Sequence, residues 1–302
     1  MQHHFTSPVV DIKRADVEDL IKVAIYEDAP DGDITSETLF DRNHFSFAKV
    51  ISKSKGIFCG NRISGLLIEI FNEIANYNIK ILNSLQDGDE FLENQELLKL
   101  KGETAGLLRI ERVLLNFIQL LSGISTQTHK VIQAIQGINK SIFILDTRKT
   151  IPGFRILSKY AVYCGGGSNH RIHLSDMAMI KENHLSIGLS LKEAVRQIKS
   201  KHPTKPIEIE VQDFRMIEEV LSIEPDIIML DNFSIEEIKK AVELIEDYCN
   251  NHSLSKPKIE ISGGWRPDKF YLLKDLENIG VSMGYLTHNV QFLDMSMDFE
   301  TL

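Results

Sequence analysis

The sequence predicts an α/β protein, with a small mixed α+β domain over residues 1–124 and a parallel α/β barrel of about six strands over residues 125–289. From residue 142 onward, short apolar runs alternate with amphipathic stretches at fairly regular spacing. The runs are continuous in Ile, Val, Leu and Met, which is typical of parallel strands buried on both faces. Six such units make a barrel somewhat smaller than the common eight-stranded form.

Helices and strands are predicted in the first domain, without an obvious chemical motif. The spacing of apolar residues predicts helices over 16–26 and 63–74. The strand-like runs are 45–51, 56–59, 79–82 and 97–100.

A longer stretch, residues 110–121, is apolar on more than one face and therefore predicts a buried helix. Ser122 and Gly123 are expected to end this helix, and another is expected over 126–136. Arg112 lies within the apolar stretch, where a charge needs an anionic partner. Glu111 and a ligand anion are equally good candidates for that partner.

The barrel elements follow from the second half of the chain. Helical spacing recurs between its apolar runs. The predicted strands are 142–146, 177–181, 206–211, 226–231, 258–264 and 278–284, and the predicted helices are 155–162, 191–201, 216–221, 235–248 and 269–276.

Composition limits the classes of partner. The formal net charge of −9 argues against nucleic acid or an anionic membrane surface as a partner. The sequence contains no apolar run long enough for a membrane span, and its first residues lack the pattern of a signal peptide. Three cysteines without a CxxC motif fit reduced thiols in a cytoplasmic protein.

The stretch from residue 145 to residue 184 gathers cations beside glycines. Glycines let backbone N–H groups approach an anion, and basic side chains at strand ends complete such a pocket. We therefore predict a site for phosphate and carboxylate groups together. The cations are Arg148, Lys149, His170, Arg171 and Lys181, and the glycines are Gly165, Gly166 and Gly167.

The carboxyl ends of the predicted strands indicate where further ligands lie, because reactive groups gather there in parallel barrels. Two carboxylates among them suit Mg²⁺, a hard ion that prefers oxygen ligands and keeps most of its waters. A Ser-Gly-Gly run and a later glycine are typical of a grip on a terminal phosphate. The residues at these ends are Arg148, Lys149, Lys181, Glu210, Asp231, Ser262, Gly263, Gly264 and Gly284.

Three other chemistries are conceivable for residues of this region. A zinc set of His170, His173 and His184 lacks the helical spacing of such sites and is not favoured. Cys164 has no identifiable base and is expected to be a small buried residue. Lys181 at a strand end, among other cations, could form a Schiff base, and this alternative stays open.

The chain resembles the quinolinate phosphoribosyltransferase family, the carboxylating nicotinate-nucleotide pyrophosphorylases, over nearly its whole length. The most specific signal is TRKT-x-PG followed at this spacing by GGG-x-NHR. The matching segments are EDAPDGDIT (27–35), ERVLLNFIQLLSGIST (111–126), LDTRKTIPGFR (145–155), KYAVYCGGGSNHR (159–171), MIKENH (179–184), EIEV (208–211), DIIMLDN (226–232), SGG (262–264) and MGYLTH (283–288).

The resemblance implies an N-terminal open sandwich packed on the barrel, to which the C-terminal tail, 290–302, returns. It also implies an enzyme of NAD biosynthesis that joins quinolinate to phosphoribosyl pyrophosphate in the presence of Mg²⁺. A homodimer or higher homo-oligomer is implied, in which Arg112 completes a neighbour's site.

Roles for individual residues follow from the same resemblance. Lys149, Lys181, Glu210 and Asp231 would be catalytic, and the two carboxylates would hold the ribose and the magnesium pyrophosphate, directly or through water. The 5′-phosphate would lie at Ser262–Gly264 and Gly284. The cationic and polar residues around quinolinate and the other phosphates would be Arg112, Thr147, Arg148, Lys149, His170, Arg171 and Lys181.

Two alternatives to this enzymatic function remain. One is a related paralogue associated with molybdenum transport, and the other is a phosphate-binding barrel without catalytic activity. The chain departs from the family pattern at Ile151, Tyr163 and Gln212, none of which is an assigned site residue.

Overall fold

The structure, a computed structural model, describes residues 6–301, whose contacts form two compact units. We call the unit formed by 9–130, 149–167 and 285–301 the antiparallel unit. The remaining described segments, 6–8, 131–148 and 168–284, form the parallel unit. The chain passes between the units more than once. The predicted domain limits, 1–124 with 290–302 and 125–289, stay a prediction.

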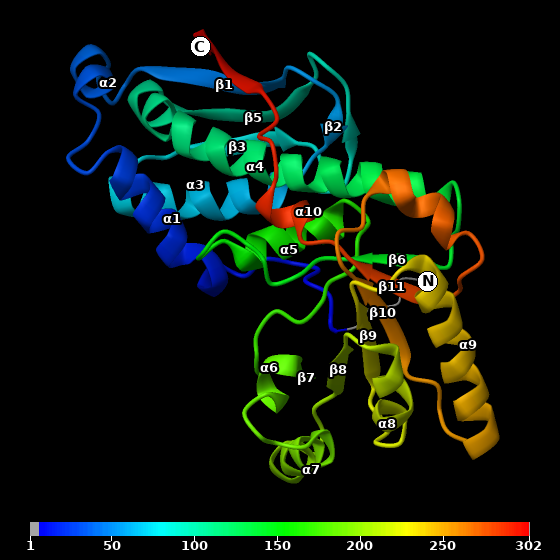
Figure 1. The fold of residues 1–302 in the computed structure, drawn as a ribbon. Coiled ribbons are helices and arrows are strands. Elements are labelled where there is room, and N and C mark those ends of the chain that lie inside the picture. Colours follow the sequence, from blue (N-terminus) through cyan, green and yellow to red (C-terminus); the bar gives the residue numbers. More distant parts are fainter. Residues whose placement is uncertain (1–5, 302) are drawn as a thin grey trace. The chain divides into compact units, whose positions relative to one another are not determined.

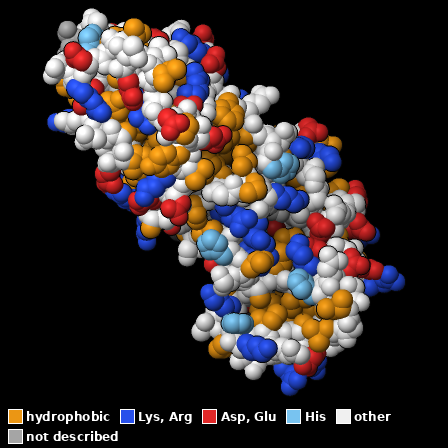
Figure 2. Space-filling view, turned by 90° about the vertical axis from the view of Figure 1, so that its left-hand side faces the viewer, with side chains coloured by type: hydrophobic (Ala, Val, Ile, Leu, Met, Phe, Trp, Pro, Cys, Tyr) orange, Lys and Arg blue, Asp and Glu red, His pale blue; other side chains and the backbone are white. Residues whose placement is uncertain are grey.

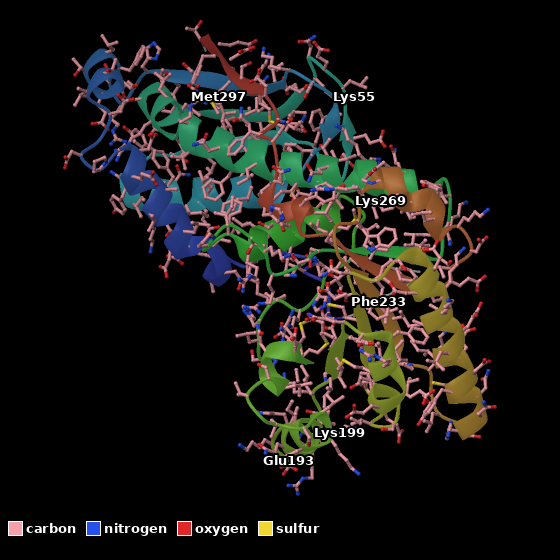
Figure 3. The ribbon with its side chains drawn as sticks, viewed as in Figure 1. Lys55, Glu193, Lys199, Phe233, Lys269 and Met297 are labelled. Carbon is pink, nitrogen blue, oxygen red and sulfur yellow. The ribbon has the colours of Figure 1, made fainter. Side chains whose placement is uncertain are left out.

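The antiparallel unit is built on a four-stranded sheet in the order β12-β1-β5-β3 (Figure 1). Burial alternates along β1, with Ala48 and Val50 fully buried, as expected of a sheet with one covered face. At the edge, Met297 of β12, which is labelled in Figure 3, pairs with Val50. The strands are β1 (Phe45–Ser52), β3 (Lys80–Ser84), β5 (Glu96–Glu103) and β12 (Met295–Thr301), with a short ribbon of β2 (Gly56–Ile57) and β4 (Glu90–Phe91).

The other elements of this unit are helical. Asp33 caps α2 by accepting hydrogen bonds from the backbone N–H groups of Thr35 and Ser36. The predicted helices 16–26, 63–74 and 155–162 are present. The helices are α1 (Arg14–Asp28), α2 (Ile34–Leu39), α3 (Asn61–Ala75), α5 (Arg155–Cys164) and α10 (Tyr285–His288).

Helix α4 corrects one prediction. It runs without a break over Thr104–Gln136, so the expected end at Ser122 and Gly123 is wrong. Ser125 Oγ donates back to the carbonyl of Leu121 at 3.0 Å, which keeps a polar side chain satisfied inside the helix. Gly123 is required for close packing, because a Cβ there would lie 2.2 Å from the carbonyl oxygen of Gln291. The glycine therefore makes room for the C-terminal segment and does not end the helix.

The parallel unit contains a six-stranded sheet in the order β6-β11-β10-β9-β8-β7, in which neighbouring strands run parallel. The predicted fold class is therefore confirmed. Among the described residues no ladder joins β6 to β7, so the ring of strands is open between them. The strands are β6 (Ile142–Leu145), β7 (Ala178–Ile180), β8 (Ile207–Val211), β9 (Ile227–Asp231), β10 (Lys258–Ser262) and β11 (Ile279–Ser282).

Helices connect these strands, as Figure 1 shows for α7, α8 and α9. The N-terminus of α9 has a capping box in which Ser234 and Glu237 bond to each other's backbone N–H. The segment predicted as a helix over 269–276 is the 3-10 helix η2 (Pro267–Leu273), and a 3-10 turn, η1 (Phe214–Met216), precedes α8. The α-helices are α6 (Glu182–Leu185), α7 (Leu191–Lys201), α8 (Ile217–Leu221) and α9 (Ile235–His252).

The surface carries charge of both signs. On the face shown in Figure 2, apolar patches are interrupted by acidic, basic and histidine side chains. Leu174 and Ile187 are among the exposed apolar residues. Across the described residues, no helix combines the length and apolar character needed to span a bilayer.

Candidate active site

The carboxyl ends of the parallel strands bring several predicted site residues to one edge of the sheet. Asp231 on β9 lies in register with Ser262 on β10. Glu210 on β8 pairs with Met229 of β9, two residues before Asp231. Because side chains two residues apart on a strand point to the same face, these polar groups share one face of the sheet. Phe233, labelled in Figure 3, marks the chain just beyond the end of β9.

Lys181 and Glu210 form an ion pair at this edge. The Lys181 ammonium nitrogen lies 2.6 Å from Glu210 Oε2. The other carboxylate oxygen of Glu210 accepts a hydrogen bond from Gln212 Nε2 at 3.1 Å. Gln212, one of the departures from the family pattern, thus helps to fix the orientation of Glu210.

Asp231 is held by its neighbour Asn232, whose side-chain amide donates to Asp231 Oδ2 at 2.8 Å. The backbone N–H of Asn232 bonds to the carbonyl of Ser262, which ties the ends of β9 and β10 together. Gly263 must be glycine here, because its φ is +105° and a Cβ would lie 2.4 Å from Asn232 Oδ1. Among the described residues, no backbone carbonyl accepts from the N–H groups of Gly263 and Gly264.

Arg148 and Arg171 provide the clearest indication of an anionic ligand. Arg171 is buried, and its guanidinium donates to the carbonyl of Met177 at 2.8 Å. The Nε atoms of both arginines are buried and have no hydrogen-bond partner among the described residues. Burial and then the positive charge of Arg148 lower the pKa of Arg171. Unsatisfied buried donors on two mutually repelling cations are costly, and an anion bound between them would satisfy both.

His170, predicted to surround the substrate, is buried and contacts two carboxylates. Its Nε2 lies 3.1 Å from Glu208 Oε2 and 3.2 Å from Glu260 Oε2. Burial by itself lowers the pKa of His170, but the charge of Glu260 and the hydrogen bonds to both carboxylates raise it to about 10. Burial and the charge of Glu260 raise the pKa of Glu208 to about 7.

The zinc set that was not favoured from sequence does not form. The group of possible metal ligands found among the described residues contains His170 with Glu208 and Glu260, and neither His173 nor His184 belongs to it. The ring nitrogen Nδ1 of His184 instead accepts the backbone N–H of Lys181 at 3.0 Å.

Two predicted site residues, Arg112 and Lys149, belong to the antiparallel unit. The side chain of Arg112 is 59% exposed and lies 3.8 Å from Glu111 Oε1. The expectation that this arginine is buried is wrong, because its position on α4 faces solvent. Its guanidinium therefore needs no ligand to offset a cost of burial. The carbonyl of Lys149 accepts from Thr287 Oγ1 at 2.7 Å. The roles of both side chains stay predictions.

Gly165 to Gly167 do not present free N–H groups to an anion. Their N–H groups bond to the carbonyls of Ala161, Tyr163 and Val162, respectively. A Cβ at Gly165 would lie 2.4 Å from the carbonyl oxygen of Ser125, so close packing against α4 requires glycine there. The interpretation of this run as part of an anion site is therefore wrong.

Sequence reasoning missed four buried polar residues. Asp146 accepts the backbone N–H of His170 at 2.8 Å and the side-chain amide of Asn169 at 2.6 Å. Glu208 and Glu260 are fully buried. A signal for the two glutamates was present, because in IEIEV and KIEIS each charge interrupts an apolar strand. Their partner, His170, could not be inferred from the order of residues along the chain.

A cavity of about 330 Å³ lies beside Arg171. The polar side chains along it include His184 and Gln197, and Leu174, Ile180 and Ile198 provide apolar surface. This volume lies within the range typical of small-molecule sites. The parallel unit thus offers room for a small ligand next to a buried cation.

Comparison with known proteins identifies the family. Residues 33–122 match the model of the quinolinate phosphoribosyl transferase N-terminal domain, and residues 124–298 match that of its C-terminal domain. A probable nicotinate-nucleotide pyrophosphorylase (carboxylating) of Methanocaldococcus jannaschii is 37% identical over 280 residues, which cover 92% of this chain and 95% of that protein. The Mycobacterium leprae nicotinate-nucleotide pyrophosphorylase (carboxylating) is 32% identical over 93% of this chain and 96% of that protein.

Solved structures agree. The nicotinate-nucleotide pyrophosphorylase of Francisella tularensis superimposes on this chain with a TM-score of 0.88 and is 33% identical in sequence. The match covers 98% of this chain and 100% of that chain. NadC of Streptococcus pyogenes gives a TM-score of 0.86 at 33% identity and covers 97% of this chain and 99% of that chain. The resemblance noted in the sequence is confirmed, and this chain belongs to the quinolinate phosphoribosyl transferase family.

Proposed function

We propose that this chain is a decarboxylating quinolinate phosphoribosyltransferase of NAD biosynthesis. It joins quinolinate to phosphoribosyl pyrophosphate and forms nicotinate mononucleotide, CO₂ and pyrophosphate. Family membership supports this reaction. The structural observation that carries it is the pair Arg148 and Arg171, whose buried Nε donors lack partners among the described residues. Quinolinate, with two carboxylates, can satisfy both.

Binding of the anionic substrates requires cations, and the chemical step requires carboxylates. Arg148, Arg171, Lys149 and Lys181 would neutralise the substrate carboxylates and the phosphates, together with Thr147 and Arg112. The ring nitrogen attacks ribose C1 as pyrophosphate leaves, so positive charge develops on the sugar. A carboxylate near the ribose stabilises that charge. Loss of CO₂ then leaves negative charge at ring C2, next to the cationic nitrogen, and C2 takes up a proton.

Glu210 and Asp231 are the residues that would hold Mg²⁺. Both present carboxylate oxygens, the donors that Mg²⁺ prefers, at neighbouring strand ends. Asn232 and Gln212 orient these carboxylates, which fits a site that binds the ion directly or through water. When bound, Mg²⁺ would neutralise negative charge on the departing pyrophosphate.

The 5′-phosphate of the co-substrate would lie at Ser262, Gly263, Gly264 and Gly284. The N–H groups of Gly263 and Gly264, which bond to no backbone carbonyl of the described residues, support this assignment, because phosphate oxygens accept hydrogen bonds from such groups. A side chain at Gly263 would collide with Asn232, so the same glycine also keeps the end of β10 against β9.

Assembly and compartment are parts of the same proposal. A homodimer, in which Arg112 of one subunit completes the other's site, fits the exposure of this arginine on α4. A cytoplasmic location fits the three cysteines, Cys59, Cys164 and Cys249, which are free thiols. We propose no nucleic-acid or membrane partner for a chain with a net charge of −9.

The test is mononucleotide formation from quinolinate and phosphoribosyl pyrophosphate, with equal release of CO₂. Chelation of Mg²⁺ should abolish turnover, and added Mg²⁺ should restore it. Absence of mononucleotide at saturating substrates would refute the proposal and favour the molybdenum-associated paralogue or a non-catalytic barrel. A Schiff-base lyase is less favoured, because Lys181 is held by Glu210.

A further inference from the structure

A buried triad of His170, Glu208 and Glu260 lies within the parallel unit, and the proposed function gives the two glutamates no role. His170 Nε2 contacts Glu208 Oε2 at 3.1 Å and Glu260 Oε2 at 3.2 Å. Both glutamates have no exposed surface. Burying two carboxylates beside one imidazole is costly, and an apolar core at these positions would avoid the cost. The arrangement therefore calls for a functional explanation.

The strands place this triad directly beneath the candidate site. Glu208 lies two residues before Glu210 on β8, and Glu260 lies two residues before Ser262 on β10. Side chains alternate along a strand, so each glutamate shares a face with the site residue that follows it. The triad is thus the layer below the polar edge that would receive the substrates.

The hydrogen bonds of the imidazole indicate a proton site and not a metal site. Nδ1 of His170 accepts the backbone N–H of Arg171 at 2.7 Å. A histidine that binds a metal through Nε2 instead donates an Nδ1 proton to an acceptor. The nearby carboxylates favour a second proton on the ring, which would lie on Nδ1. The Arg171 N–H opposes this proton, because it donates to Nδ1. Nε2 carries its proton in both charge states. Nε2 bonds to Glu208 Oε1 at 3.5 Å and pairs by charge with Glu260, whose carboxylate oxygens accept no hydrogen bond among the described residues.

The same segment is fixed from a third strand. The backbone N–H of His170 bonds to Asp146, directly after β6, and the Asn169 side chain bonds to the same carboxylate. Residues 169–171 are therefore anchored to β6 through Asp146 and to β8 and β10 through the imidazole. Arg171 follows immediately, with one guanidinium nitrogen on the carbonyl of Met177 and Nε without a partner among the described residues.

We propose that Glu208 and Glu260 are positioning residues: they hold the His170 ring, which in turn holds Arg171 where its free Nε meets a carboxylate of the substrate. The proposal rests on the proposed function. Glu208 and Glu260 would not touch substrate themselves. Their effect would reach the reaction through His170 Nδ1 and the backbone of Arg171, so it should appear mainly in the binding of the dicarboxylate.

The experiment uses substitutions that keep the volume. In Glu208→Gln and Glu260→Gln, a polar side chain of the same size stays beside the imidazole but loses the negative charge that attracts the ring. Each should raise KM for quinolinate on the order of ten-fold, because small displacements of a binding group are costly. KM for phosphoribosyl pyrophosphate should change much less. Glu260→Leu, which removes the polar group as well as the charge, should raise KM for quinolinate further than Glu260→Gln.

A matched control separates positioning from general destabilisation. Glu103 is also a buried carboxylate, but it lies in the antiparallel unit, where Oε2 accepts the backbone N–H of Asn78 at 2.9 Å. Glu103→Gln should lower the melting temperature and leave KM for quinolinate unchanged. If the two triad variants behave like this control, with lower stability and normal KM, the triad is structural only and the positioning role is refuted.

A double-mutant cycle tests the route through Arg171. In an Arg171→Ala background, Glu260→Gln should add little to KM for quinolinate, because the group that it positions is already missing. Additive effects would overturn the proposal. Failure of the proposed function looks different, because the unsubstituted enzyme would then form no mononucleotide. If the unsubstituted enzyme is active and the variants keep its KM, only the positioning role fails.

Discussion

Lys181 at the end of β7 and Glu210 at the end of β8 are joined by an ion pair of 2.6 Å. Glu210 is nearly inaccessible, with a side chain 8% exposed, whereas the side chain of Lys181 is 41% exposed. The pair keeps an ammonium group at the edge of the site and leaves a carboxylate beneath it. An anionic substrate would approach the lysine first.

Borohydride should therefore fail to trap substrate on Lys181. A nitrogen that is hydrogen-bonded to Glu210 must leave this partner before it can attack a carbonyl carbon. Intact-mass measurement after borohydride treatment with substrate should show the unmodified chain. A covalent adduct mapped to Lys181 would move this chain to the Schiff-base class.

Quinolinate should be preferred over nicotinate by at least about 10²-fold in kcat/KM, because a missing carboxylate leaves buried donors unpaired. The donors concerned are the Nε groups of Arg148 and Arg171. Competing assays with both pyridine acids measure the ratio. Comparable turnover of nicotinate would place the chain in the non-decarboxylating class.

Glu210→Gln and Asp231→Asn should each lower kcat by about 10²-fold or more and change quinolinate affinity little. Both carboxylates are assigned to the ribose and the metal, whose electrostatic demands peak in the transition state. Steady-state kinetics with calorimetric quinolinate binding separate the two effects. Normal kcat with weakened quinolinate binding would show that the carboxylates contact the pyridine substrate instead.

Arg112→Ala and Lys149→Ala should complement each other when the two inactive variants are dissociated, mixed and reassembled. If Arg112 serves the neighbour's site, each hybrid dimer has one intact site of two. Random reassembly should then recover about a quarter of the unsubstituted activity. The experiment needs proof that hybrids form, for example by tag-selective purification. Confirmed hybrids without activity would show that Arg112 serves its own subunit's site or only the fold.

Stability should fall as the pH rises through the range in which Glu208 titrates. Burial and the charge of Glu260 raise the pKa of Glu208 from 4.5 to about 7 on folding. Between these two values the folded chain binds more protons than the unfolded chain, so this contribution to stability is present below the lower value and is lost toward the upper one.

Melting temperatures of the unsubstituted protein and of Glu208→Gln, measured from pH 5 to pH 9, test this linkage. The advantage of the unsubstituted protein over the variant should shrink as the pH rises, because glutamine has no proton to lose. A difference that does not depend on pH would contradict the titration assigned to Glu208.

The sequence by itself determined the alternation of strands and helices in the second half of the chain. Runs such as DIIMLD and PIEIEV contain mostly buried strands whose local composition and burial agree, so β8 and β9 could be predicted nearly to the residue. The rule that parallel strands place their carboxyl ends at one edge then located Lys181, Glu210, Asp231 and Ser262. The expected reaction came from the resemblance of the sequence motifs to those of the family.

The tertiary structure decided which atoms meet. Gly123 reads locally as the end of a helix, but α4 continues through it, because the glycine accommodates the carbonyl of Gln291, distant in sequence. Gly165 likewise reads as an anion-binding glycine and instead packs against Ser125. The contact of His170 with Glu208 and Glu260 joins residues 38 and 90 positions apart along the chain. No local pattern encodes such contacts, since they depend on which strands lie side by side in the folded chain.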